Sequence, residues 1–236
     1  MYGANALSSF TLVKVLLASL SVLGAVSLCA CTVPATPTSP TAAVTADTTT
    51  ITADGFDSTF YRAFLQNGYE SPDRLEEIRI LHGPLRIYLR TFDDGGRAID
   101  RATLDATERT LIEAAKIWSG EMFSAQIERG SATRERQAGW LTVKWAMAPS
   151  GERCGRSTVG VDGGFIELNA SGSCSCGSTS LVYPRLVRHE LGHAMGYYHT
   201  DSPADVMYGN IISSETCDLL PSDRERRHAK IAHQSN

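Results

Sequence analysis

Hydrophobic residues recur at regular spacings through most of the chain, and these spacings predict both helices and strands. One set lies at helical spacing and predicts a helix with one apolar face: Leu104, Leu111, Ala115 and Trp118. Asp100 is a suitable N-terminal cap for this helix, and Gly120 is a suitable stop. A shorter helix is expected at residues 56–65.

Alternating apolar and polar residues predict strands at 85–89, 123–127, 141–147, 158–161 and 165–169. Two further helices are expected. One covers residues 181–195 with Pro184 in its first turn, and the other begins near a capping box formed by Ser222 and Glu225. This order of elements predicts an α/β or α+β fold with one mixed, twisted sheet.

The N-terminal part of the chain differs in composition from the rest. Residues 15–30 carry no charge and follow Lys14, which is typical of an export signal and too short for a membrane-spanning helix of about 20 residues. The run ends in LCAC, which resembles a bacterial lipobox with residues 1–30 as signal peptide and Cys31 as the lipidated residue. Residues 31–54 are rich in Thr, Ala and Pro and are expected to form a tether. We therefore expect an exported protein of the cell envelope, held at the membrane only by this lipid anchor, or secreted if the leader is cut without lipidation.

Composition limits the remaining possibilities. The chain has 236 residues, a net charge of −4 and 42% hydrophobic residues, which fits one ordinary folded domain. We assign residues 85–236 to that domain and residues 55–84 to a lead-in segment. Without a basic excess, a nucleic-acid partner has no electrostatic support.

If Cys29 leaves with the leader and Cys31 takes the lipid, four cysteines remain: Cys154, Cys174, Cys176 and Cys217. An even number in an exported domain predicts two disulfides. Cys174 and Cys176 are too close in sequence to bridge each other without strain, so each is expected to pair with Cys154 or Cys217. A cysteine-based metal site is disfavoured by the tight C-x-C spacing.

The candidate metal-binding and catalytic residues lie between His189 and His199. His189 and His193 lie four residues apart, so a helix would place both imidazoles on one face. Glu190 lies beside the first of them, where its carboxylate can reach a water molecule on a shared metal ion. Gly196 can adopt a positive φ, end the helix and turn the chain so that His199 becomes the third ligand. Three imidazoles and one water would make a tetrahedral zinc site with an open position, whereas a structural zinc normally has four protein ligands.

This stretch resembles the zinc-binding motif of the metzincin endopeptidases. Met207 stands where that clan has its Met-turn. The chain is most similar to the matrixins, because Thr200 follows His199, Pro203 comes four residues after His199, and Tyr208 follows Met207. The resemblance implies a zincin fold with a mixed sheet, an active-site helix and a small C-terminal subdomain after the third histidine.

The resemblance also implies a function: a zinc-dependent endopeptidase with one catalytic zinc and a protein or peptide substrate. Glu190 would act as general base on the water, and Met207 would form an apolar floor beneath the metal. The candidate residues for the substrate pocket are Tyr208, Asn210, Ile211 and Ile212. An extended peptide would add as a strand along residues 158–161.

The sequence departs from the matrixin pattern at several positions. There is no histidine between His82 and His189, so a second, structural zinc is not expected. No cysteine lies between Cys31 and Cys154, so latency by a cysteine on the zinc is not expected either. Gly209 stands where a proline commonly follows the Met-Tyr pair.

Two further questions stay open at this stage. A calcium site could use Asp93, Asp94 and Asp162, but such Asp-Gly loops are most often ordinary turns, and we favour turns. The alternatives to a protease are a zinc-containing surface binding or adhesion module and an amidohydrolase of cell-wall peptides. An intact Glu190 argues against a pure binding module.

The other aromatic and imidazole side chains are assigned structural roles. The tryptophans lie on or near predicted core faces and are expected to pack in the core: Trp118, Trp140 and Trp145. The histidines outside the motif are expected at the surface: His82, His228 and His233.

Overall fold

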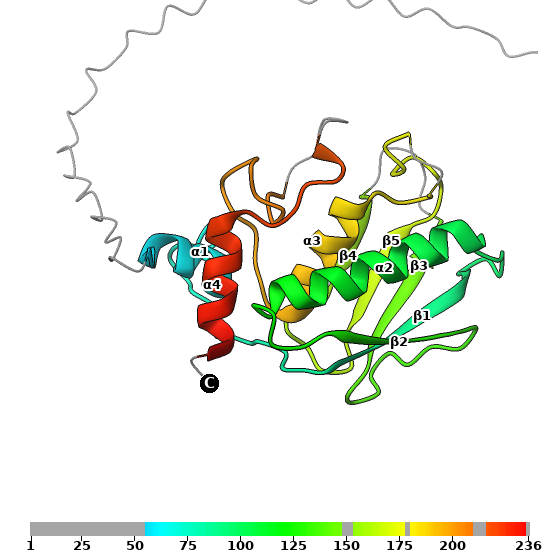
Figure 1. Ribbon diagram of the computed structural model, residues 1–236, viewed down its shortest axis with the longest axis horizontal. Coiled ribbons are helices and arrows are strands. Elements are labelled where there is room, and N and C mark those ends of the chain that lie inside the picture. The colour runs from blue at the N-terminus through cyan, green and yellow to red at the C-terminus, as the bar shows by residue number, and fades with distance from the viewer. Residues whose placement is uncertain (1–54, 148–152, 178–179, 210–215, 235–236) are drawn as a thin grey trace, which may run out of the picture. The chain divides into compact units, whose positions relative to one another are not determined.

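A five-stranded mixed sheet forms the centre of the computed structural model, which describes residues 55–147, 153–177, 180–209 and 216–234 (Figure 1). The strand order is β2-β1-β3-β5-β4. The strands are β1 (Leu85–Asp93), β2 (Ala125–Gly130), β3 (Leu141–Ala146), β4 (Gly155–Ser157) and β5 (Phe165–Asn169). β2, β1, β3 and β5 run parallel, and β4 pairs antiparallel with β5 at one edge. The prediction of a mixed sheet in an α/β domain is therefore confirmed.

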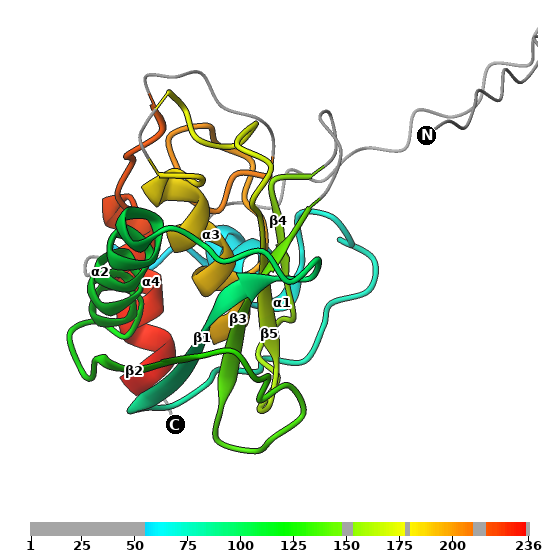
Figure 2. The same cartoon turned by 90° about the vertical axis from the view of Figure 1, so that its right-hand side faces the viewer.

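The four helices within the described residues are α1 (Ser58–Gln66), α2 (Arg101–Trp118), α3 (Pro184–Met195) and α4 (Asp223–Gln234). α2 and α3 contact each other and lie on the same face of the sheet (Figure 2). The core between them includes the fully buried side chains of Trp118, Trp145 and Leu191. Trp140 is also buried, so the prediction that all three tryptophans pack in the core is confirmed.

The helix ends follow the local sequence signals. The Asp100 carboxylate accepts a hydrogen bond from the Thr103 backbone N–H at 2.8 Å, which caps α2. Pro184 lies in the first turn of α3, where its missing N–H is not needed. At the start of α4 the backbone N–H groups of Ser222 and Glu225 each donate to the other's side chain, so the predicted capping box is present.

One predicted strand was wrong. The edge strand β4 covers Gly155–Ser157, and residues 158–161 form no strand. The chain turns there because Gly160 has a φ of +57°, and its N–H donates to the His193 carbonyl instead of a neighbouring strand. A further bond from Gly164 N–H to the Val161 carbonyl closes the turn.

The placement of two histidines was also wrong. His228 and His233 are buried, with 1% and 3% of their surface exposed, whereas His82 is exposed. His228 is buried because α1 and α4 lie side by side, and its Nε2 accepts the Asp57 backbone N–H at 3.0 Å. The contact with α1 thus removes one side of α4 from solvent.

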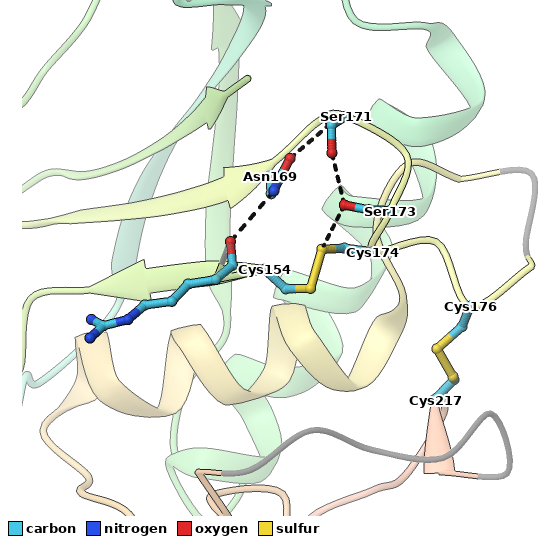
Figure 3. The surroundings of a disulfide bond; sticks show 8 residues. Cys154, Asn169, Ser171, Ser173, Cys174, Cys176 and Cys217 are labelled. Carbon is cyan, nitrogen blue, oxygen red and sulfur yellow. Dashed lines mark hydrogen bonds between the residues drawn. A yellow bond between two sulfur atoms is a disulfide. The ribbon is translucent and has the colours of Figure 1, made fainter. Parts of the chain in front are cut away.

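Two disulfides connect the loop after β5 to the segments on either side of it (Figure 3). Cys154 pairs with Cys174, and Cys176 pairs with Cys217, with Cα–Cα distances of 5.6 and 6.3 Å. The expectation that neighbouring Cys174 and Cys176 take different partners is confirmed. The first bridge fixes the start of β4, which contacts α3.

The predicted export signal, the tether and Cys31 lie outside the described residues, as do Asn210, Ile211 and Ile212. Within the described part of the chain, no helix has the length and apolar character required to cross a membrane.

Candidate metal centre

Helix α3 and the turn that follows it bring three histidines together. His189 and His193 lie one turn apart on α3, with ring centroids 4.7 Å from each other. Gly196 ends the helix at a φ of +115°, and its N–H donates to the carbonyls of Gly192 and His193. A Cβ atom at Gly196 would lie 2.0 Å from the Arg79 carbonyl oxygen, so only glycine fits this turn.

The turn directs His199 back toward the helix. Its ring centroid lies 5.2 Å from that of His189 and 4.7 Å from that of His193. One ligand nitrogen from each of the three rings lies within 4.8 Å of the other two. The described residues therefore bring together the three histidines predicted from the sequence, in an arrangement that could bind a metal ion.

Each ring has one nitrogen committed to a protein acceptor. His189 Nδ1 lies 2.7 Å from the Val206 carbonyl, and His193 Nδ1 lies 2.8 Å from the Tyr197 carbonyl. Because a carbonyl oxygen only accepts, both Nδ1 atoms carry the proton and both Nε2 atoms keep a free electron pair. His199 Nδ1 lies 2.6 Å from a Glu70 carboxylate oxygen, and its Nε2 is 3.1 Å from His193 Nε2.

Burial keeps the imidazole rings of His189 and His193, the two histidines on α3, uncharged. It lowers the pKa of His189 to about 4 and holds the pKa of His193 well below its usual value. Neutral imidazoles are the form that binds metal ions, and free Nε2 atoms pointing at one spot are the geometry that a metal requires. The donor set therefore fits a divalent cation that prefers nitrogen ligands.

Glu190 lies beside this group on α3 and is 4% exposed. Burial raises its pKa to about 8, and within the described residues its Oε2 atom has no hydrogen-bond partner. The edge strand β4 packs directly against it, since a Cβ atom at Gly155 would lie 2.6 Å from Glu190 Oε1. A buried carboxylate with a free oxygen and a high affinity for protons is suited to accept and release a proton.

Met207 lies in the turn that packs against Gly192 of α3 and is fully buried. Its sulfur is 2.5 Å from the position that a Cβ atom at Gly192 would take, so the glycine in the motif allows this close approach. Tyr208, the next residue, is partly buried. The Met207 carbonyl accepts the Thr200 N–H at 3.0 Å, which ties the turn to the residue after His199.

The turn is held by side chains from two helices, which sequence reasoning missed. The Glu225 carboxylate accepts the backbone N–H groups of Val206 at 3.0 Å and Met207 at 2.8 Å. A buried arginine, Arg185, donates to the Asp205 carbonyl at 2.7 Å. The capping-box sequence identified Glu225 as a cap, but nothing in it indicated that the same carboxylate reaches a segment 18 residues earlier.

The acidic residues considered for calcium form hydrogen bonds or ion pairs with other groups of the protein. Asp93 Oδ1 accepts the backbone N–H groups of Gly95 and Arg97. Asp94 pairs with Arg90, and Asp162 accepts the Gly139 N–H. The Asp93 contacts are those of an ordinary Asp-Gly turn, whereas Asp162 bonds a backbone N–H 23 residues earlier in the chain.

Fold and site together define a class: a mixed α/β domain with a three-histidine group that could bind a metal ion. No protein-family model matches the chain, and no curated protein matches it in sequence. Function therefore has to be inferred from the chemistry of the residues themselves.

Proposed function

We propose that this protein is a zinc-dependent endopeptidase of the metzincin kind, most similar to the matrixins. The observation that carries the proposal is the position of Glu190. Its buried carboxylate, with a free oxygen, lies on the same helix as two of three histidines whose ligand nitrogens lie within 4.8 Å of one another.

The ligand set favours a catalytic zinc over a structural one. Three imidazoles leave one tetrahedral position free, whereas structural zinc sites use four protein ligands, often cysteines. Here all four cysteines in the described residues form disulfides. The three histidines are each partly exposed, which leaves the centre accessible to a substrate.

The chain's own residues supply the remaining steps. When bound, zinc would polarise the scissile carbonyl and activate a water molecule. Glu190 would take a proton from that water while the water oxygen bonds to the carbonyl carbon. It would then deliver the proton to the amine nitrogen as the C–N bond breaks, which gives a carboxylate and a free amine. Met207 forms an apolar surface beneath the histidines.

The edge of the sheet offers a place for the substrate. β4 pairs with β5 on one side and is the last strand of the sheet. An extended peptide could add to its outer side as a further strand, held by main-chain hydrogen bonds. Because Gly155 contacts Glu190, a peptide bound along Gly155–Ser157 would pass close to the carboxylate that acts as base. We place the protein in the cell envelope, in agreement with the lipobox-like sequence before Cys31.

The test compares three samples of the full-length chain in mild detergent: wild type, wild type treated with a zinc chelator, and Glu190→Ala. Cleavage of a quenched peptide library is measured together with bound zinc. We expect Glu190→Ala to keep its zinc and to lose about 10²- to 10⁴-fold in rate, the usual contribution of a general base. Failure of folded, zinc-loaded wild type to cleave any peptide would contradict the proposal and favour a zinc-containing binding module.

A further inference from the structure

The third histidine differs from the other two in what fixes its ring. His189 and His193 donate to the backbone carbonyls of Val206 and Tyr197. His199 instead contacts the side chain of Glu70, 129 residues earlier in the sequence, at 2.6 Å. It also lies beyond the end of α3, so the helix does not hold its ring.

We propose that Glu70 is a positioning residue of the metal centre, which orients His199 and sets its affinity for zinc. This inference rests on the proposed zinc site. A carboxylate that accepts the Nδ1–H of a histidine fixes the tautomer, so that Nε2 presents its electron pair to the metal. It also makes that nitrogen a stronger ligand, because the negative charge of the carboxylate stabilises the positive charge that metal binding would place on the ring.

The backbone around Glu70 is fixed to the segment that carries His199. The Tyr198 N–H donates to the Phe64 carbonyl at 2.8 Å, which joins the last turn of α1 to the residue before His199. The rings of Phe64 and Tyr197 stack with centroids 4.5 Å apart. Both rings are fully buried, so this connection belongs to the core.

The chain between α1 and Glu70 is short and ordered. Asn67 ends α1 in the left-handed conformation, with a φ of 57°. Gly68 N–H then donates to the Arg62 carbonyl, and Ser71 N–H to the Asn67 carbonyl. These bonds lie on both sides of Glu70, so its carboxylate reaches His199 from a defined turn.

A plain surface ion pair is the alternative explanation. The Glu70 side chain is 51% exposed, and exposed pairs of this kind contribute little to stability. The two explanations differ in what they predict for metal binding, since a surface pair would leave zinc affinity unchanged. Loss of a carboxylate that orients a ligand typically weakens metal binding by about 10- to 100-fold.

The experiment measures metal binding without substrate. Zinc dissociation constants are determined by chelator competition for full-length wild type, Glu70→Ala, Glu70→Gln and Asp73→Ala. Asp73 is an exposed carboxylate on the same segment and serves as the matched control. The visible spectrum of the cobalt-substituted protein reports ligand geometry, and circular dichroism of the metal-free variants reports folding.

We expect Glu70→Ala to bind zinc about 10- to 100-fold more weakly and to change the cobalt spectrum, while Asp73→Ala matches wild type. Glu70→Gln should lie between them, because its amide oxygen still accepts the Nδ1–H but carries no charge. Wild-type zinc affinity and cobalt spectrum in folded Glu70→Ala would overturn the inference and leave the protease proposal standing. Weakened zinc binding in Glu70→Ala, together with no cleavage by wild type, would support the inference and contradict the protease. A wild type that binds no zinc would overturn both.

Discussion

Individual glycines set how closely the parts of the centre approach one another. Gly192 lies between His189 and His193, and a side chain there would collide with the Met207 sulfur. Gly196 allows the turn that returns His199 to the helix. At both positions of the motif, packing alone requires a glycine, whether or not a metal ion is bound.

Gly155 makes the most direct steric contact with the proposed base, and its substitution gives a prediction. Gly155→Ala should displace Glu190, since the new Cβ would lie within 2.9 Å of three atoms of that buried side chain. The backbone itself tolerates alanine, because Gly155 is not among the residues with positive φ. We expect kcat to fall by at least about 10-fold, as expected when a base is misplaced.

Zinc affinity is the control for Gly155→Ala. It should stay within about twofold of wild type, because the three atoms nearest to the new Cβ all belong to Glu190 and none to a histidine. A twofold change corresponds to well under 1 kcal/mol. Unchanged kcat in the variant would show that Glu190 does not have to occupy its observed position.

At the scale of whole elements, α4 supports the centre although it contributes no ligand to it. Glu225 lies in its first turn and accepts three backbone N–H groups, from Val206, Met207 and Ser222. His189 Nδ1 donates to the Val206 carbonyl, so the peptide held by Glu225 also orients a ligand. The helix thereby connects the C-terminal part of the chain to the metal centre.

Glu225→Ala should therefore affect both stability and metal binding. It would leave three N–H groups without their acceptor, two of them in buried residues, and each buried, unpaired group costs about 1–3 kcal/mol. We expect a loss of at least about 2 kcal/mol in the free energy of unfolding, with weaker zinc binding. Denaturant unfolding checks the first effect and chelator competition the second.

The matched control on the same helix is Asp223→Ala. Asp223 is an exposed residue whose side chain pairs with Arg226 on the surface. Its removal should change stability by less than about 0.5 kcal/mol. Equal effects of the two substitutions would argue against a special role for the Glu225 carboxylate.

Sequence reasoning worked best where the signal is local. The helix carrying His189 and His193, the Asp100 and Ser222 caps and the paired cysteines all depend on residues close in sequence or on simple counting. It failed where distant segments meet. The contact between α1 and α4 buries His228, and no periodicity within α4 indicates which neighbour will cover it.

The same distinction applies to the centre itself. Three ligands and the adjacent carboxylate lie within 11 residues and form a recognisable motif. Glu70 and Glu225 lie far from that motif in sequence and belong to no pattern of spacing. Their contacts depend on how distant segments pack in the folded protein, and spacing patterns in a single sequence do not predict that packing.

For the molecule as a whole, His233 predicts how stability changes with pH. Burial, followed by the nearby His82, lowers the pKa of His233 from 6.5 to about 4. The unfolded chain therefore binds a proton as pH falls through 6.5, while the folded protein does not until about pH 4. Stability should fall between these values, by about 2–3 kcal/mol in total at 1.4 kcal/mol per pKa unit.

His233→Phe isolates this contribution. Phenylalanine suits the site, because His233 packs against the rings of His82 and Phe123. Wild type and variant are unfolded by denaturant between pH 7 and 4, and the difference between them removes the effect of every other titrating group. The variant should lose less stability on acidification. Parallel curves for the two proteins would contradict the assignment.

The neighbouring positions of α1 and α4 also have a consequence for biosynthesis. Glu70 follows the first helix, while Glu225 lies on the last one, and the two helices are in contact. A growing chain that has just exposed its three histidines still lacks the segment that fixes the Met207 turn. The turn beside the three histidines can therefore reach its final geometry only after α4 has been synthesised.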